Sequence, residues 1–294
     1  MLATAGVPDI MVTNQIVDAA ALEELVAAAK HAGVSALVDD IAHVTALDTA
    51  AARAGVTIGA IVEIDTGMRR CGVPADSEAL IVLATAIRES RALSFAGLQA
   101  YDGHVAAIAD PQSREEAAAH TTAQAALALD RLKAMGITVA TVAGCSTGHM
   151  PFLGKLGLWT DIQAGSYLLM DGVYGGYVDL EFRQALFALA TVIHRSPDRI
   201  VLDIGLKQLA VDRGNPSWID DPSAVLRLSD EHAVIATAGP SPLRVGDRTW
   251  IVPRHVDPTV NLHPMLWLWD GDAVRPAAID GRMAARKSHT PIKA

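Results

Sequence analysis

The sequence predicts an α/β protein: a partial TIM-like βα barrel in residues 1–183, followed by a mostly antiparallel β domain in residues 184–294. Up to about Arg183, short apolar runs alternate with alanine-rich stretches of helical period. This alternation is typical of a parallel sheet whose strands are buried on both faces. Beyond Arg183, strand-like runs are separated by turn-rich pieces, which favours antiparallel β structure.

The first part offers about six βα units, whereas a closed TIM barrel needs eight. Each expected strand is a short apolar run bounded by turn residues. The count therefore predicts a barrel that lacks its first two units. The expected strands are Asp9–Thr13, Ala36–Asp39, Gly59–Ile64, Ala96–Tyr101, Val139–Ala143 and Asp161–Gln163.

The alanine-rich stretches between these strands predict helices with recognisable ends. Asp18 precedes the first helix as an N-cap, and Gly33 is expected to provide its left-handed exit. Ser113 followed by Glu116 has the spacing of a capping box. The expected helices are Ala19–Ala32, Val44–Ala54, Ser77–Ser90 and Ser113–Met135, with a short turn near Phe152–Leu156.

The second part carries a His-x-Asp pair, His255 and Asp257, in a segment that we expect to form a loop between its prolines. Imidazole suits zinc, and carboxylate suits manganese or magnesium, so the pair is a candidate metal site. An isolated His-x-Asp is more often simply a polar loop between strands. The expected strands around it are Leu186–His194, Arg199–Leu209, Val225–Leu228, Ala233–Ala238, Trp250–Val252 and Met265–Trp269.

Composition narrows the class of protein. The chain is 51% hydrophobic and 19% charged, and its net charge of -9 argues against a nucleic-acid surface. No apolar run reaches the roughly 18 residues of a membrane-spanning helix, and no targeting segment is recognisable. We therefore expect a cytoplasmic protein with no membrane partner, in which Cys71 and Cys145 stay reduced.

Polar residues that follow the expected strands are the candidate site residues, because barrel sites form where strands end and loops begin. Arg70 follows the third strand, and Tyr101 and His104 belong to the end of the fourth. Each of them also has a structural interpretation, as a basic residue in an exposed turn, a core tyrosine and a surface histidine. The loops Gly144–His149 and Ala164–Tyr167 are rich in small and hydroxyl residues, and free backbone N–H groups there would make a phosphate cradle.

Six motifs, taken in order, resemble the metal-activated, fold-type III pyridoxal-phosphate family, which includes D-threonine aldolases, 3-hydroxy-D-aspartate aldolases and D-serine dehydratases. The resemblance covers nearly the whole chain and implies the architecture of alanine racemase, a TIM-like barrel followed by a β domain. The motifs are DTGMRRCG, GLQAYDGH, GCSTGHMPF, DIQAGSYLLMD, LDIGLKQLAVDRG and PRHVDPTVNLH.

The resemblance implies pyridoxal 5'-phosphate and a divalent metal as cofactors. It makes Thr147, Gly165 and Ser166 phosphate contacts, Tyr101 a cofactor contact, and Arg70 a residue that faces cofactor or substrate. His255 and Asp257 become the metal ligands. Dehydratase members tend to carry His-x-Cys at this position and aldolase members His-x-Asp. Asp257 therefore favours aldolase chemistry and manganese or magnesium over zinc.

One departure from the family concerns lysine. The family binds its cofactor through a lysine at the end of the first barrel strand, whereas this chain begins at what resembles the third strand. None of the lysines stands in the family's N-terminal motif. They are Lys30, Lys133, Lys155, Lys207, Lys287 and Lys293. We therefore expect either an N-terminally truncated fragment or a degenerate relative, and the abrupt entry at a buried strand favours truncation.

The expected function is a lyase of the D-threonine aldolase type, which cleaves D-β-hydroxy-amino acids into glycine and an aldehyde. The alternative within the family is a D-serine or 3-hydroxyaspartate dehydratase. An alternative of another class is a non-catalytic homologue that serves as a binding scaffold. His104 is a weak candidate for the catalytic base. Resemblance also implies a homodimer when the protein is full length.

Overall fold

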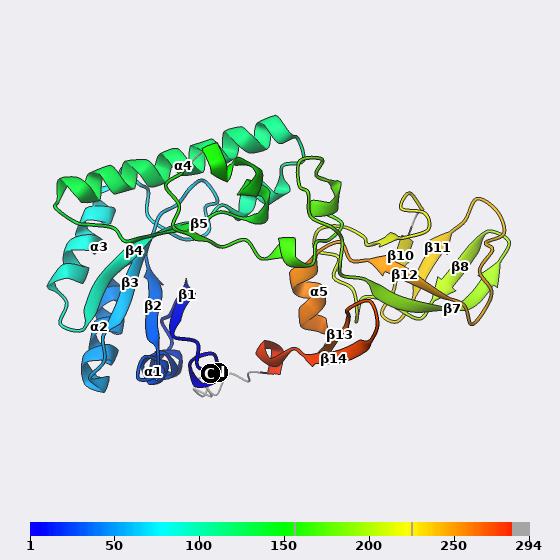
Figure 1. The fold of residues 1–294 in the computed structure, drawn as a ribbon, viewed down its shortest axis with the longest axis horizontal. Coiled ribbons are helices and arrows are strands. Elements are labelled where there is room, and N and C mark those ends of the chain that lie inside the picture. The colour runs from blue at the N-terminus through cyan, green and yellow to red at the C-terminus, as the bar shows by residue number, and fades with distance from the viewer. Residues whose placement is uncertain (156, 225, 284–294) are drawn as a thin grey trace, which may run out of the picture. The chain divides into compact units, whose positions relative to one another are not determined.

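The computed structural model describes residues 1–155, 157–224 and 226–283. The chain forms two compact units, Met1–Ala164 and a second that begins at Gly165 (Figure 1). Residues 165–183 hold only short helical turns. The expected boundary at residue 183, which was based on where the strand pattern changes, remains a prediction.

The first unit is built on a six-stranded sheet with the order β1-β2-β3-β4-β5-β6. All five neighbouring pairs are parallel, which confirms the expected βα architecture. Among the described residues β1 and β6 do not pair, so the sheet is open. The strands are β1 Asp9–Gln15, β2 Gly33–Val38, β3 Ile58–Glu63, β4 Leu93–Ala100, β5 Thr141–Gly144 and β6 Asp161–Ile162.

The expected helices are present, but several of their ends differ from the expectation, and the second helix begins at Ile41 instead of Val44. The first helix ends at Ala28 and leaves through a short turn, so Gly33 begins β2 and is not the helix exit. The long helix begins at Pro111, a residue favoured in the first turn, and not at Ser113. Its N-cap is therefore Asp110, whose side chain accepts a hydrogen bond from the Ser113 N–H at 2.8 Å. The helices are α1 Ala19–Ala28, α2 Ile41–Ala54, α3 Glu78–Glu89 and α4 Pro111–Ala134; short 3-10 helices include η2 Gly103–Ala107 and η3 Thr147–Lys155.

The two faces of the parallel sheet have different roles. One face packs against the helices, which Figure 1 shows lying along one side of β2, β3 and β4. This face and the helices share one apolar core, to which the strands contribute Ala36, Val38, Ala60, Val62 and Leu98. Because side chains alternate along a strand, the opposite face carries the intervening residues. Those include Leu37 and Ile61 and, at the strand ends, Glu63 and Gln99.

Gly97 lets β4 and β5 pair closely. It pairs with Thr141, and a Cβ at position 97 would lie 2.2 Å from the Thr141 carbonyl oxygen. We expect Gly97→Ala to destabilise the first unit by about 1–3 kcal/mol, as overpacked sites do. Urea unfolding measures this change. Gly154→Ala is the control, because a Cβ there meets nothing within 4 Å. Equal unfolding midpoints for the two variants would contradict the expectation.

The second unit contains a six-stranded antiparallel sheet with the order β10-β11-β8-β7-β12-β9 and a separate hairpin of β13 and β14. The expected strand Arg199–Leu209 ends at Leu202, because the chain turns there and Gly205 packs against the Ser229 carbonyl. Two strands, β9 and β14, were not expected. The strands are β7 Ala188–Ser196, β8 Arg199–Leu202, β9 Ser217–Trp218, β10 Leu226–Leu228, β11 Ala233–Ala236, β12 Arg248–Val252, β13 Met265–Trp269 and β14 Val274–Ala278.

The prediction of a loop after β12 is wrong. The His-x-Asp segment instead forms the start of the helix α5, Val256–Leu262. His255 is the N-cap residue, and Asp257 lies in the first turn. Pro258 is compatible with this helix because the first turn needs no N–H from that position. The carboxylate of Asp257 also suits the positive end of the helix dipole.

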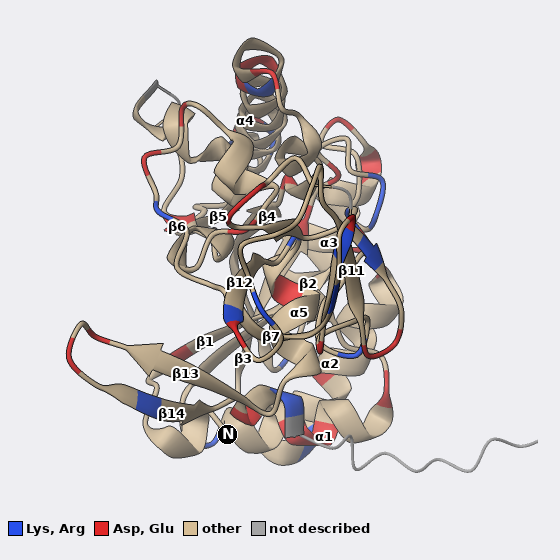
Figure 2. Ribbon diagram, turned by 90° about the vertical axis from the view of Figure 1, so that its right-hand side faces the viewer, with Lys and Arg blue, Asp and Glu red and all other residues tan. Residues whose placement is uncertain are grey.

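The placement of charged residues and the hydropathy of the helices agree with what the composition indicates. Figure 2 shows Lys and Arg scattered among Asp and Glu, with no continuous basic stripe along any labelled element. Within the part of the chain that the structure describes, no helix combines the length and the apolar character needed to cross a membrane.

Candidate functional site

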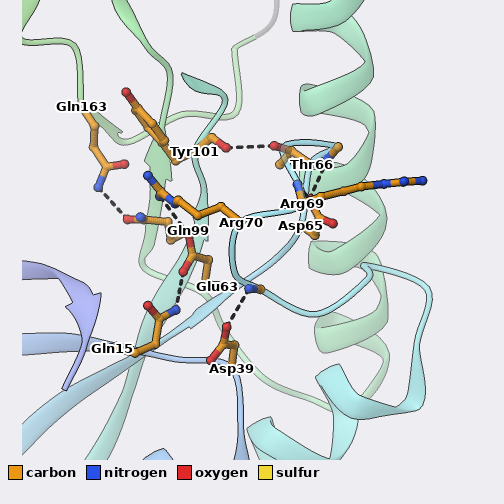
Figure 3. Close-up of polar contacts among 12 residues, drawn as sticks. Gln15, Asp39, Glu63, Asp65, Thr66, Arg69, Arg70, Gln99, Tyr101 and Gln163 are labelled. Carbon is orange, nitrogen blue, oxygen red and sulfur yellow. Dashed lines mark hydrogen bonds and ion pairs between the residues drawn. The ribbon is translucent and has the colours of Figure 1, made fainter. Parts of the chain in front are cut away.

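A polar layer occupies the ends of the parallel strands, on the face away from the helices. Gln15 donates to Glu63, and Gln163 donates to Gln99 at 2.6 Å (Figure 3). Glu63 and Gln99 are also register partners on β3 and β4. Sequence reasoning missed these residues. A polar residue at the last position of an otherwise apolar strand was the available signal.

The loop after β3 is held in one shape by two aspartates. Asp65 accepts from the backbone N–H of Arg69 at 3.0 Å, and Asp39 accepts from that of Gly72 at 2.7 Å. Gly72 has φ +95°, and a Cβ there would lie 2.6 Å from the backbone of Ile64. Only glycine fits this position. Figure 3 shows the consequence: Arg69 and Arg70 leave the loop in opposite directions.

Arg70 and Tyr101, both expected from the sequence, lie together. The Arg70 guanidinium carbon is 5.4 Å from the centre of the Tyr101 ring, within the range of a cation–π contact. Its Nη2 also lies 3.5 Å from the buried Glu63 carboxylate. The arginine is half exposed. Its N–H donors are therefore available at the strand ends, next to the Tyr101 ring and the Glu63 carboxylate.

His104 lies beside the same loop. It belongs to η2, and its Nε2 would be 3.8 Å from a Cβ at Gly67. Its Nδ1 is buried and has no hydrogen-bond partner among the described residues. The Thr66 hydroxyl donates to the Tyr101 carbonyl at 2.9 Å and joins the two loops. The sequence therefore identified a histidine that does reach the candidate site.

The loop after β5, expected to be a phosphate cradle, is anchored by a buried pair. Asp102 accepts from the Ser146 N–H at 2.7 Å and lies 2.5 Å from His149 Nδ1. The Ser146 N–H is thus not free, which corrects the expectation for that group. The Ser146 hydroxyl and His149 Nε2 remain buried without a partner among the described residues. Burial, with a smaller contribution from Asp102, raises the pKa of the Cys145 thiol, so this thiol stays protonated.

The three expected phosphate contacts are divided between the units. Thr147 is buried and begins η3 in the first unit. Gly165 and Ser166 stand at the start of the second unit, where Gly165 precedes a single 3-10 turn of Ser166–Leu168. Each loop is therefore described within its own unit, and their shared role remains a prediction.

In the second unit, His255 lies between two carboxylates. Its Nδ1 is 2.6 Å from Asp212 Oδ2, and its Nε2 is 3.3 Å from Asp257 Oδ2. The ring is 19% exposed, whereas Asp212 is 50% and Asp257 70% exposed. The structure thus brings the two expected metal ligands together. It adds Asp212, which lies within a recognised motif but had no assigned role.

The start of α5 is fixed from outside the helix. Buried Asp171 accepts from the Val256 N–H at 2.9 Å, which satisfies one of the backbone donors at the helix start. Arg254 donates to the Gly172 carbonyl at 2.6 Å. These contacts anchor the backbone N–H that follows His255 and the side chain that precedes it.

Comparison with known proteins places the chain in a family. The model of the alanine racemase N-terminal domain matches residues 2–171, and that of the serine dehydratase domain matches residues 185–269. The chain is 37% identical to D-threonine aldolase of Arthrobacter sp over 265 residues, which are 88% of this chain and 70% of that protein. It is 36% identical to 3-hydroxy-D-aspartate aldolase of Paracoccus denitrificans over 275 residues, 89% of this chain and 70% of the relative.

The chain belongs to the fold-type III pyridoxal-phosphate family.

Solved structures agree with this fold-type III assignment. The crystal structure of D-threonine aldolase from Filomicrobium marinum superposes with a TM-score of 0.87 at 36% identity, covering 94% of this chain and 76% of that one. D-threo-3-hydroxyaspartate dehydratase of Delftia sp. is more distant, with 25% identity over 74% of this chain and 64% of the relative. The expected family and its barrel-plus-β architecture are confirmed.

The residues present fit the cofactor that the fold-type III family implies. The buried, unpartnered hydroxyl of Ser146 offers a donor that a phosphate oxygen would satisfy. The half-exposed Arg70 provides a planar donor group beside the ring of Tyr101. Both features belong to loops at the carboxyl ends of parallel strands, where barrel proteins bind their ligands.

The His255–Asp257 pair also fits a divalent ion. Two adjacent ligand atoms that each lie about 2.1 Å from an ion, at right angles, are separated by about 3 Å. The observed separation of 3.3 Å between Nε2 and Oδ2 is close to this value. The site therefore needs no rearrangement of the chain to receive an ion.

A second cluster of ligand-type atoms overlaps the polar layer. Asp39, Glu63 and Cys71 offer atoms within 4.8 Å of one another. However, Asp39 already accepts from Gly72 and Glu63 from Gln15. Burial, followed by the charges of Glu63 and Asp39, raises the pKa of the Cys71 thiol. Two of the three members are therefore already engaged in hydrogen bonds of the polar layer.

Proposed function

We propose that this protein is a pyridoxal-phosphate- and divalent-metal-dependent lyase of the D-threonine aldolase type. It cleaves D-β-hydroxy-amino acids at the Cα–Cβ bond to give glycine and an aldehyde. The observation that supports it best is the His255–Asp257 pair, with its ligand atoms 3.3 Å apart, in a chain related to two aldolases. The carboxylate at position 257 favours manganese or magnesium over zinc.

The residues at the strand ends are proposed to hold the cofactor. Thr147, Gly165 and Ser166 would contact the phosphate, and Tyr101 and Arg70 would contact the ring or the substrate carboxylate. Pyridoxal phosphate, when bound, supplies an electron sink for the carbanion that bond cleavage leaves on the substrate. Buried Glu63 lies beside the Arg70 guanidinium and limits where that group can point.

The residues at the start of α5 are proposed to act on the substrate's hydroxyl group. His255 and Asp257 would hold a divalent ion, whose chemistry is to lower the pKa of a hydroxyl. His104, with its buried and unpartnered Nδ1, is the candidate group for accepting a proton. Imidazole is the side chain that most often serves as a general base in enzymes.

Product analysis with D-threonine and manganese tests this function. We expect acetaldehyde and glycine to appear, to depend on manganese and pyridoxal phosphate, and to be absent with L-threonine. A 2-oxo acid with ammonia would instead show the dehydratase reaction. Absence of both products would contradict a lyase and favour a binding scaffold.

The family binds its cofactor through a lysine at a strand end. Lys30 follows α1, Lys133 lies in α4, and Lys207 follows β8, so none of these three ends a strand of the parallel sheet. None of the six lysines stands in the family's N-terminal motif, so we expect this chain to bind pyridoxal phosphate without covalent attachment. Borohydride reduction followed by mass spectrometry would detect a covalent adduct if one forms.

A further inference from the structure

Asp212 lies in the segment between β8 and β9. It contacts His255, a candidate metal ligand, at the ring nitrogen that does not face Asp257. Its Oδ2 is 2.6 Å from His255 Nδ1, a hydrogen-bond distance. A carboxylate only accepts hydrogen bonds, so this contact requires the proton to be on Nδ1. In the neutral imidazole, the form that binds a metal, the lone pair is then on the other ring nitrogen, Nε2. That nitrogen is the one 3.3 Å from Asp257.

We propose that Asp212 is a positioning residue that holds His255 in the tautomer and orientation in which Nε2 binds the metal. The proposal rests on the metal site of the proposed function. It assigns the ligand atom within that site, and it assigns a role to a carboxylate that the sequence motifs left without one. Histidine ligands commonly donate their second N–H to a carboxylate in this way.

Both neighbours of His255 in the chain make hydrogen bonds near the Asp212–His255 contact. Arg254, which precedes His255, donates its Nε–H to the carbonyl of Arg213, which follows Asp212, at 3.2 Å. On the other side of His255, the Val256 N–H donates to Asp171. Both neighbours of His255 therefore make hydrogen bonds of their own, which favour one placement of its ring beside Asp212.

Distances decide which carboxylate is the ligand. The two carboxylates lie at opposite nitrogens of one ring, so a single ion at one nitrogen has only one of them beside it. Two ligands of one ion are separated by about 3 Å. The distance of 3.3 Å between His255 Nε2 and Asp257 Oδ2 matches that geometry. The distance of 2.6 Å between His255 Nδ1 and Asp212 Oδ2 instead matches a hydrogen bond.

Manganese binding to the apo protein tests the role of Asp212. We expect Asp212→Ala to weaken Mn²⁺ binding about 10- to 100-fold, the usual effect of losing such a partner. Asp212→Asn should lose less, because the amide oxygen still accepts from Nδ1–H. The matched control is Asp272→Ala, which removes the same charge from an exposed turn of the same unit. Isothermal titration calorimetry measures all four affinities.

Nitrogen NMR on histidine-labelled wild-type protein gives a second readout that needs no variant. Without metal, the His255 Nδ1 resonance should be that of a protonated nitrogen. With Cd²⁺ bound, coupling to cadmium should appear at Nε2. Coupling at Nδ1 would overturn the proposal and would make Asp212 the ligand.

The outcomes separate this proposal from the proposed function. If Asp212→Ala binds Mn²⁺ as tightly as the wild type, the positioning role fails while the metal site stands. If the wild type binds no Mn²⁺, both the metal site and this proposal fail. If Mn²⁺ binding weakens as expected but no aldehyde is formed, only the reaction assignment fails.

Discussion

Asp102→Ala is expected to lower the free energy of unfolding of the first unit by about 3–5 kcal/mol, the range found when one partner of a buried pair is removed. Asp102 and His149 are both fully buried, with 2.5 Å between their interacting atoms. Alanine would also leave the Ser146 N–H without its acceptor. A buried donor without an acceptor keeps its full desolvation cost.

The fluorescence of Trp159 is a local probe for this change, because its ring contacts His149 edge-on with 5.6 Å between ring centres. The other four tryptophans lie in the second unit, so a Trp159→Phe background identifies the signal of the first unit by difference. Asp110→Ala serves as the control, because this exposed cap should cost about 1 kcal/mol. If Asp102→Ala lowered the free energy of unfolding no more than Asp110→Ala does, the Asp102–His149 pair would not be important for stability.

His255→Ala is expected to reduce Mn²⁺ affinity more than roughly 100-fold, beyond the effect of any outer partner. This variant removes one of the two proposed protein ligands and also leaves Asp212 without its partner. The free Mn²⁺ signal in electron paramagnetic resonance measures the affinity. Asp257→Asn should have a similarly large effect, because a neutral amide oxygen is a weaker ligand than a carboxylate.

His263→Ala provides the matched control for that experiment. His263 follows the same helix, but its Nε2 contacts the carbonyl of Gln208 at 2.9 Å. We expect this variant to keep Mn²⁺ affinity within about twofold of the wild type while losing some stability, since it loses only one typical hydrogen bond. Equal losses at His255 and His263 would mean that the metal does not bind at the start of α5.

The local sequence pattern correctly predicted the strands of the first unit. Buried β-rich runs alternate there with alanine-rich stretches, and all six expected strands overlap a strand of the parallel sheet. The pattern was less informative after β12. Prolines on both sides of His255 suggested a loop, but a proline in the first helical turn is compatible with α5. In that segment, local preferences permitted both answers, and contacts from Asp171 and Gly172 selected the helix.

The sequence by itself determined the family, the order of the strands and most of the residue types that the site uses. Only the tertiary structure decided which of them meet. Asp212 and His255 are 43 positions apart, and Asp102 and His149 are 47 apart. Gln15 and Glu63 meet only because β1, β2 and β3 are neighbours in register. Such contacts depend on strand pairing and loop anchoring between distant segments, and the short-range spacing of residues along the chain does not encode them.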